Sequence, residues 1–247
     1  MPRFKFIQKR AIDRGTGFVQ PNEDLGTLRS LLPPSTLTKT AAICSGGEVP
    51  LTLLLPISQE VVAVDHAATS LAWAYCKALM MEKLSGDAIK KLFLFEALHI
   101  LDLFRELEPE VPDALRGKGP FKRLDGWPNY LGPLWLTIPT YSIDQAREKL
   151  DSLTMIHGDL RDLDGEFDLF YSSNAHCGHA GHDGRSPTYN DYAKIVRHGG
   201  HVLATAYNPH RTDNRWKLVS QKRFKEGRGQ IMSDWCYQLH EKVGESK

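Results

Sequence analysis

The sequence predicts an α/β protein built on a mainly parallel, doubly wound sheet. Short apolar runs alternate along the chain with segments of helical pattern, and a glycine-rich turn or a polar residue follows several of these runs. This alternation is typical of parallel sheets, because a crossover helix usually connects two parallel strands. A chain of 247 residues can bury one large core, and we expect a single domain over 1–247.

The expected elements follow from apolar periodicity and from turn and capping residues. Strands are expected at 41–45, 61–65, 153–157, 167–172, 201–206 and, in the polar tail, near 230–238. Helices are expected at 25–32, 48–55, 68–84, 87–107, 142–151, 188–196 and near 212–225. Residues 1–22 look irregular, and we expect 1–40 to form an N-terminal cap segment.

One segment, 108–141, interrupts the alternation. It holds six of the 14 prolines and two of the five tryptophans. Because it is too long for an ordinary loop in a compact domain, we interpret it as a helical and aromatic insertion that covers a site. Trp127, Tyr130 and Trp135 would either close over an acceptor or simply pack.

Composition and charge narrow the classes of partner. The formal net charge is +1, so no overall field favours nucleic acid or an acidic membrane, and nucleic acid is a less favoured partner. No run of 18 apolar residues predicts a membrane span. The N-terminus is basic without an apolar core, and the four cysteines are scattered. We therefore expect a cytoplasmic protein with free buried thiols, whose oligomeric state stays open.

A glycine-rich turn follows the first expected strand, and an acidic residue follows the second. The turn is Ser45-Gly46-Gly47, and Asp65 stands 18 positions after Gly47. Glycines let the backbone pass close to a ligand, N–H groups at a helix start face a carboxylate, and an aspartate suits the hydroxyls of ribose. These strand ends predict a nucleoside-binding site.

Two further strand ends extend this site. Asp159 is suited to accept from an adenine amino group while Leu160 packs on the ring, and Ser173-Asn174 would lie beside the reacting group. The turn lacks the G-x-G-x-x-G spacing that a pyrophosphate needs, and no P-loop pattern occurs. The arrangement therefore favours S-adenosylmethionine over a dinucleotide.

These motifs resemble the class I S-adenosylmethionine-dependent transferases, and more narrowly the diacylglyceryl homoserine synthase group. The resemblance spans roughly residues 18–206 and rests on Ile43-Cys44-Ser45-Gly46-Gly47, Val61-Val62-Ala63-Val64-Asp65, Glu23-Asp24, Ser173-Asn174 and Gly199-Gly200. It implies a Rossmann-like class I methyltransferase fold with an insertion. It also implies S-adenosylmethionine as the cofactor and transfer of its 3-amino-3-carboxypropyl arm.

The segment after Asn174 departs from that group, so a lipid acceptor is not carried over. His176, Cys177, His179 and His182 crowd into seven residues. Imidazole and thiolate bind zinc, but structural zinc sites usually draw paired ligands from separated segments, so we expect no metal. A neutral His176 near the acceptor would suit a general base, whereas a polar, glycine-rich surface loop is the favoured interpretation.

The cofactor-binding residues are expected to be Cys44, Ser45, Gly46, Gly47, Asp65, His66, Asp159, Leu160, Ser173 and Asn174. The residues expected to take part in catalysis are Glu23, Asp24, Asn174 and His176.

The sequence thus favours an S-adenosylmethionine-dependent transferase. The reaction is expected to be 3-amino-3-carboxypropyl transfer to a small-molecule, peptide or nucleotide-like acceptor. A methyltransferase on the same scaffold is the first alternative, because the cofactor motifs do not decide which carbon is attacked. A non-catalytic Rossmann-like binding subunit is the second.

Overall fold

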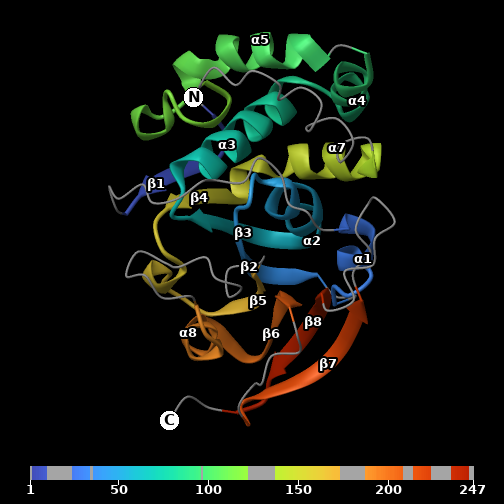
Figure 1. Cartoon of the computed structure of the whole chain (residues 1–247), viewed down its shortest axis with the longest axis vertical. Coiled ribbons are helices and arrows are strands. Elements are labelled where there is room, and N and C mark those ends of the chain that lie inside the picture. Colours follow the sequence, from blue (N-terminus) through green and yellow to red (C-terminus); the bar gives the residue numbers. More distant parts are fainter. Residues whose placement is uncertain are drawn as a thin grey trace.

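The computed structural model describes residues 2–9, 24–33, 36–95, 97–121, 137–172, 187–207, 214–223 and 235–244. Within these ranges the strands join into one sheet of eight (Figure 1). They are β1 (Lys5–Gln8), β2 (Leu37–Ile43), β3 (Ser58–Asp65), β4 (Leu153–His157), β5 (Phe167–Ser172), β6 (Val196–Tyr207), β7 (Trp216–Arg223) and β8 (Trp235–Lys242).

The strand order across the sheet is β1-β4-β3-β2-β5-β6-β8-β7. Pairings from β1 through β6 are parallel, and β8 runs antiparallel to both β6 and β7. The chain builds outward from β2 through β3 to β4, and then returns to the other side of β2 as β5. Strand order therefore reverses at β2, and ligands of open α/β sheets bind at the carboxyl ends of strands near such a reversal.

The described helices alternate with these strands. The α-helices are α1 (Leu25–Arg29), α2 (Leu55–Ile57), α3 (Ala68–Lys83), α4 (Gly86–Phe95), α5 (Ala97–Leu107), α7 (Thr140–Glu148) and α8 (Tyr189–Ile195). A π-helical segment, η1 (Val49–Leu54), precedes α2, and short 3₁₀ segments include η4 (Gly119–Phe121), η5 (Leu150–Ser152) and η6 (Leu160–Asp162). In Figure 1, α3, α4, α5 and α7 lie in the upper half of the view and α8 in the lower half.

Helices cover both faces of the sheet. On one face, Ala63 of β3 and Met155 of β4 belong to the same buried cluster as Leu71 and Trp73 of α3. On the other face, Phe170 of β5 packs in a second cluster with residues of α8, and its ring stacks on that of Tyr192 at 5.2 Å between centroids. The predicted mainly parallel, doubly wound α/β sheet, the Rossmann-like class I methyltransferase fold, is confirmed.

The N-terminal residues form a strand that the sequence did not predict. β1 pairs in parallel with the edge of β4, although 1–22 were expected to be irregular. Three of its four side chains are exposed, so no alternating apolar pattern marks it. Phe4 just before the strand and Phe6 within it make edge-to-face contacts with Tyr75 of α3, and this packing fixes the segment on the sheet.

The C-terminal tail corrects a second expectation. The helix expected near 212–225 is wrong, because β7 occupies Trp216–Arg223 and pairs antiparallel with β8. The strand expected near 230–238 is β8, which begins at Trp235 and extends to Lys242. The hydrogen bonds between β7 and β8 decide the structure of this segment.

Two other expectations are refined. The helix expected at 87–107 is two helices, α4 and α5, on either side of residue 96, which lies outside the described ranges. The described first part of the expected insertion, 108–121, packs against α3. A Cβ built on Gly119 would stand 3.0 Å from both Ala72 Cβ and the Thr69 carbonyl oxygen. Its aromatic part, 122–136, lies outside the described residues, so coverage of a site stays a prediction.

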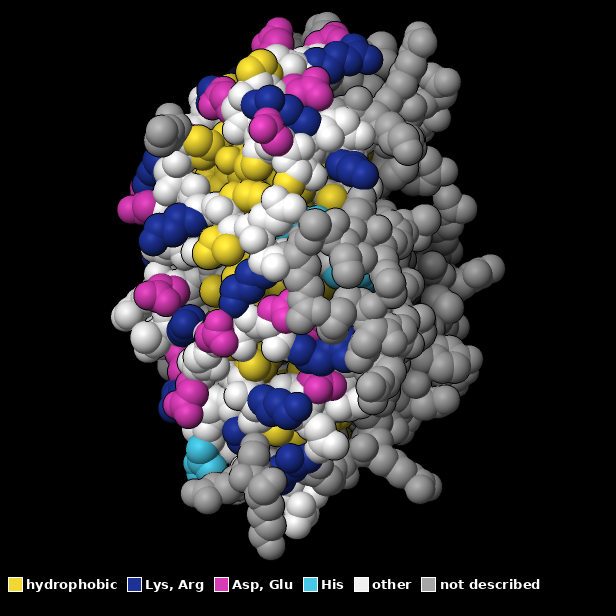
Figure 2. Space-filling model, turned by 90° about the vertical axis from the view of Figure 1, so that its left-hand side faces the viewer, with side chains coloured by type: hydrophobic (Ala, Val, Ile, Leu, Met, Phe, Trp, Pro, Cys, Tyr) yellow, Lys and Arg dark blue, Asp and Glu magenta, His cyan; other side chains and the backbone are white. Residues whose placement is uncertain are grey.

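The surface gives no single-sign field on the face that Figure 2 shows. Lysine and arginine side chains alternate there with aspartate and glutamate side chains, and apolar groups gather in its upper part. Among the described residues, no helix is long and apolar enough to cross a membrane. Cys44, Cys76 and Cys236 are free and buried, as expected of buried thiols, and Cys177 lies outside the described ranges.

Candidate functional site

The glycine-rich turn lies at the carboxyl end of β2, where the strand order reverses. The Gly47 N–H donates to the Cys44 carbonyl at 2.7 Å, which closes a four-residue turn. Both central residues have positive φ, 43° at Ser45 and 91° at Gly46. A turn with two positive φ values strongly favours glycine, so the local sequence and the backbone agree.

Position 47 requires glycine for two reasons: its φ is 106°, and its backbone lies very close to a helix. A Cβ built on it would stand 2.7 Å from Ala74 Cβ and 2.8 Å from Ala74 Cα. Ala74 belongs to α3, which packs directly behind the turn. The turn therefore cannot move toward the helix, and η1 begins immediately after it at Val49.

Asp65 joins the turn to the end of the neighbouring strand. Its Oδ2 accepts from the Ser45 N–H at 3.2 Å, and its Oδ1 accepts from the Ala67 N–H at 2.9 Å. Burial raises the pKa of this carboxyl, which the Ala67 N–H, the nearby His66, the Ser45 N–H and the Ser70 hydroxyl oppose in part. A carboxylate has about four acceptor positions, so capacity remains for a hydroxyl of a ligand.

A buried ion pair lies behind the same turn. Lys77 of α3 has its Nζ 2.5 Å from Glu48 Oε1 and donates to the Gly46 carbonyl at 2.9 Å. Neither charged side chain is exposed. Burying two charges costs several kcal/mol per ion before their attraction offsets it, so such a pair is not a general route to stability.

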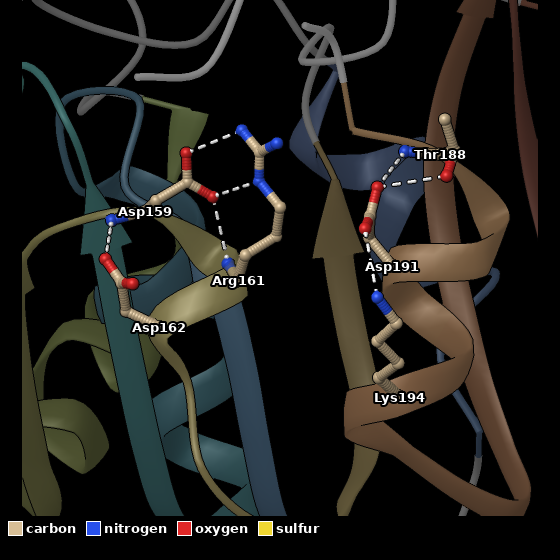
Figure 3. Close-up of polar contacts among 6 residues, drawn as sticks. All are labelled: Asp159, Arg161, Asp162, Thr188, Asp191 and Lys194. Atoms are coloured by element: carbon tan, nitrogen blue, oxygen red, sulfur yellow. Dashed lines mark hydrogen bonds and ion pairs between the residues drawn. The ribbon is translucent and has the colours of Figure 1, made fainter. Parts of the chain in front are cut away.

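Asp159 follows β4 and is engaged by its own neighbours (Figure 3). Its carboxylate forms a two-pronged pair with Arg161, Nε to Oδ1 at 2.8 Å and Nη2 to Oδ2 at 2.9 Å. It also accepts from the Arg161 N–H, while the Asp159 N–H donates to Asp162 Oδ2 at 3.0 Å. These bonds cap η6, so an adenine amino group would share this carboxylate with the guanidinium.

Figure 3 shows a second cap of the same kind at the start of α8. The Thr188 N–H donates to Asp191 Oδ2 at 2.9 Å, and the Thr188 hydroxyl donates to the same oxygen at 2.9 Å. The Lys194 Nζ lies 3.8 Å from Asp191 Oδ1. This cap satisfies donors at the start of α8, and α8 ends where β6 begins. These contacts indicate a structural cap and give no indication of ligand binding.

The structure brings together the expected residues at the ends of β2, β3 and β4. The Cys44 N–H donates to the Val64 carbonyl at 2.9 Å, and the Gly158 N–H donates to the Asp65 carbonyl at 3.0 Å. His66 follows Asp65, with Nδ1 3.8 Å from Asp65 Oδ1. Leu160 is buried in the cluster on the α8 face of the sheet.

Asp24 lies in a different role from the one expected. It caps α1, where its Oδ1 accepts from the Gly26 N–H at 2.9 Å and its Oδ2 from the Thr27 hydroxyl at 2.6 Å. Its own N–H donates to the Tyr237 hydroxyl at 2.7 Å. A part in catalysis stays a prediction. Four other predicted residues, Glu23, Ser173, Asn174 and His176, lie outside the described ranges, as does the histidine-rich segment.

Lys77 and Arg161 are the site residues that sequence reasoning missed. Lys77 is the only charged residue between Ala67 and Met81, in an otherwise mostly apolar run. A lone charge in such a run signals a buried partner, because lysine is almost never fully buried unless paired. For Arg161 the signal is weaker, since a basic residue two positions after a capping aspartate commonly lies in solvent.

The titratable groups around the turn suggest ligand binding rather than nucleophilic catalysis. Burial, reinforced by the nearby Asp65, raises the pKa of the Cys44 thiol well above its usual range. The thiol therefore stays protonated at neutral pH and is a poor nucleophile. Within the described ranges, no group of three or more histidine, cysteine or acidic side chains is arranged to hold a metal ion.

No protein-family model and no curated protein matches the sequence. Solved structures similar to the model include the N-methyltransferase NodS from Bradyrhizobium japonicum WM9 in complex with S-adenosyl-L-homocysteine. It is 10% identical, with 89% of this chain and 85% of that chain covered and a TM-score of 0.48. A ribosomal protein L11 methylase from Lactobacillus delbrueckii subsp. bulgaricus is 11% identical, with 89% and 76% covered and a TM-score of 0.41.

An rRNA methylase from Streptococcus thermophilus is 9% identical, with 89% of this chain and 93% of that chain covered and a TM-score of 0.41. Likenesses at this level transfer no activity to the chain. The functional proposal therefore depends on the residues described above.

Proposed function

We propose that the protein is an S-adenosylmethionine-dependent transferase, and that the group it transfers is the methyl group. The observation that carries this proposal is the hydrogen bond from the Ser45 N–H to Asp65 Oδ2. It joins a positive-φ glycine turn and a buried carboxylate into one unit at the reversal of strand order. A nucleoside with a charged amino-acid arm has chemistry that fits this unit.

Each part of the site takes one part of the cofactor in this proposal. The turn residues Ser45, Gly46 and Gly47 lie against the methionine arm, and Asp65 accepts from a ribose hydroxyl. Asp159 and Leu160 contact the adenine. The placement agrees with ligand binding at the carboxyl ends of strands in open α/β sheets. Ser173, Asn174 and His176 would complete the site beside the acceptor.

The bound sulfonium would supply an activated electrophilic carbon, so the chain's own residues need only bind, orient and exclude water. Alignment of acceptor and cofactor contributes up to about 7–11 kcal/mol to such a displacement. The pair Glu23-Asp24 had favoured 3-amino-3-carboxypropyl transfer. Because the Asp24 carboxylate caps α1, it lends that reaction no support, and methyl transfer is the simpler proposal.

The proposed acceptor is not a long polyanion such as a nucleic acid. Charges of both signs alternate on the face in Figure 2, and the formal net charge is +1. A nucleic-acid acceptor would need a basic face to neutralise phosphates. A small-molecule, peptide or nucleotide-like acceptor is therefore the proposed class.

Titration calorimetry with S-adenosylmethionine and S-adenosylhomocysteine tests the cofactor. Asp65→Ala removes a charged hydrogen-bond acceptor worth about 1.5–3 kcal/mol, so affinity should fall by about 10–150-fold. Asp168→Asn is the matched control, since Asp168 is also buried but lies at the opposite edge of the sheet, and it should bind normally. Absence of binding at millimolar cofactor, or equal binding by Asp65→Ala, would contradict the proposal.

Mass spectrometry of the products then identifies the reaction. Incubation with S-adenosylmethionine and panels of amines, peptides and nucleotides should yield S-adenosylhomocysteine together with a methylated acceptor. Methylthioadenosine with an enlarged acceptor would instead establish 3-amino-3-carboxypropyl transfer. Tight cofactor binding with no turnover on any panel would favour the non-catalytic binding subunit.

A further inference from the structure

The turn is held from behind by a charge that the cofactor site itself does not use. Lys77 Nζ donates to the Gly46 carbonyl at 2.9 Å and pairs with Glu48 Oε1 at 2.5 Å. Both side chains have no solvent exposure, and both belong to rigid elements, α3 and the start of η1. Lys77 thereby ties Gly46 and Glu48 to one helix, and between them the Gly47 backbone passes so close to Ala74 of the same helix that a Cβ built on it would stand 2.7 Å from Ala74 Cβ.

This contact controls the direction of one peptide group. The carbonyl and N–H of a planar peptide point to opposite sides, so fixing the Gly46 carbonyl toward α3 fixes the Gly46–Gly47 peptide as a whole. The Gly47 N–H is directed to the Cys44 carbonyl at 2.7 Å, which closes the turn. Two glycines in succession have no side chains to resist rotation, so an external contact must set their orientation.

We propose that Lys77 is a positioning residue for the amino-acid arm of S-adenosylmethionine, acting through the Gly46 carbonyl and the Glu48 carboxylate. This inference rests on the proposed function. The lysine holds the turn in the shape that accepts the methionine arm, and it neutralises Glu48 beside the place where the cofactor's carboxylate would lie. It touches no part of the cofactor.

The effect is confined to one part of the ligand. In the proposed function the ribose is held by Asp65, which contacts Ser45, Ala67, Ser70 and His66 rather than Lys77. S-adenosylhomocysteine carries the amino-acid arm, whereas 5′-methylthioadenosine has the same nucleoside without it. Loss of Lys77 should therefore weaken the first ligand and spare the second. A purely structural lysine would affect neither ligand, or both to the same degree.

The test is calorimetry of both ligands with the wild-type protein and three variants. Lys77→Met combined with Glu48→Gln removes both charges while keeping similar volumes, so no unpaired charge stays buried. We expect S-adenosylhomocysteine to bind at least about 10-fold more weakly and methylthioadenosine to change by less than about 2-fold. Glu48→Gln alone keeps the bond from Lys77 to Gly46 and leaves the lysine's positive charge near the cofactor's carboxylate, so it should bind S-adenosylhomocysteine no more weakly than the wild type.

Lys149→Met is the matched control. Lys149 Nζ also donates to two backbone carbonyls, Pro56 at 2.9 Å and Ser58 at 3.1 Å, but these precede or begin β3 at the far edge of the sheet. This variant should leave both affinities unchanged.

Equal loss of both ligands, or no loss of either, in the double variant would overturn the inference while leaving the proposed function intact. If the double variant does not fold, Lys77→Gln combined with Glu48→Gln, which also leaves no buried charge, decides by the same comparison of ligands. Failure of the wild-type protein to bind S-adenosylhomocysteine would instead overturn the proposed function, and this inference with it.

Discussion

The two edges of the sheet use the same kinds of residue for opposite purposes. Gly47, Asp65 and Lys77 lie at the carboxyl edge, where the parallel strands end. Gly199, Asp168 and Lys149 lie at the amino edge, where the parallel strands begin. Each set has a glycine at positive φ, a buried aspartate and a lysine that donates to backbone carbonyls. Their surroundings differ, and the difference separates groups that hold the fold from groups suited to a ligand.

The two aspartates show this most clearly, since each is 7% exposed. Burial acts to raise the pKa of Asp168, but bonds from the Lys39 N–H, the Arg197 guanidinium and the Thr38 N–H outweigh it, and the pKa is lowered. Burial raises the pKa of Asp65, where only backbone N–H groups, a hydroxyl and an imidazole oppose it.

Of these two carboxylates, the one that serves only the fold has a permanent cation beside it. Asp168 joins β2 to β6 through Thr38, Lys39 and Arg197, and the guanidinium already neutralises its charge. Within the described part of the chain, Asp65 has no guanidinium or ammonium partner, so a ligand can still stabilise its charge. Folding has already removed the Asp65 carboxylate from water at a cost in free energy. A ligand hydroxyl that donates to it would recover part of that cost as free energy of binding.

The largest expected effect separates the two glycines. Gly47→Ala forces an added Cβ against the Ala74 backbone at a φ of 106°, and should lower the free energy of unfolding by about 3–5 kcal/mol. Gly199→Ala has a φ of 71° with nothing within 4 Å of the added Cβ, and should cost about 1–2 kcal/mol. Guanidinium denaturation measures both, and equal costs would show that the contact with α3 is unimportant.

A smaller effect is expected at the amino edge. Asp168→Asn keeps an acceptor for the backbone of β2 but loses the charge beside Arg197. Hydrogen bonds to charged groups contribute about 1.5–3 kcal/mol, and half-exposure of Arg197 reduces this, so we expect a loss of about 1–2 kcal/mol at pH 7. Cofactor affinity should not change. A loss of affinity without unfolding would mean that the two edges are coupled.

Much of the fold could be predicted because its signals are local. The apolar runs of β3, β4 and β5 are bounded by turns, and parallel strands require crossovers between them. β1 and β7 could not be predicted in the same way. The strand β1 is mostly exposed at an edge, and β7 exists through its pairing with β8. Pairing partners far apart in sequence leave no local pattern.

The candidate site likewise contains residues that could be predicted from local sequence and residues that could not. Ser45, Gly46, Gly47 and Asp65 were predictable as neighbours, because the carboxyl ends of adjacent parallel strands meet at one edge. The pairing of Glu48 with Lys77, 29 residues apart, depends on how α3 is rotated about its axis. The ion pair between Asp159 and Arg161 depends on the rotamer of the arginine, which spacing in the sequence does not determine.

The smallest expected effect is also the sharpest test of the comparison, because it is a difference in sign. The lowered pKa of Asp168 means that its contribution to stability is fully present above the ordinary value of 3.8 and is lost as pH falls through the folded-state pKa. The raised pKa of Asp65 means that the free energy of unfolding falls as pH rises from 3.8 through the folded-state pKa.

Denaturation of the wild type, Asp65→Asn and Asp168→Asn between about pH 3 and 7 compares these slopes. The advantage of the wild type over Asp168→Asn should grow as pH rises toward 3.8 and then level off. Relative to Asp65→Asn, the wild type should lose stability as pH rises above 3.8. The substituted amide adds a constant offset through its changed hydrogen bonds, which leaves the slope untouched. Slopes of the same sign for both variants would show that the fold stabilises the charge of Asp65 as it does that of Asp168, and would remove the unneutralised charge of Asp65 as an argument for a ribose site.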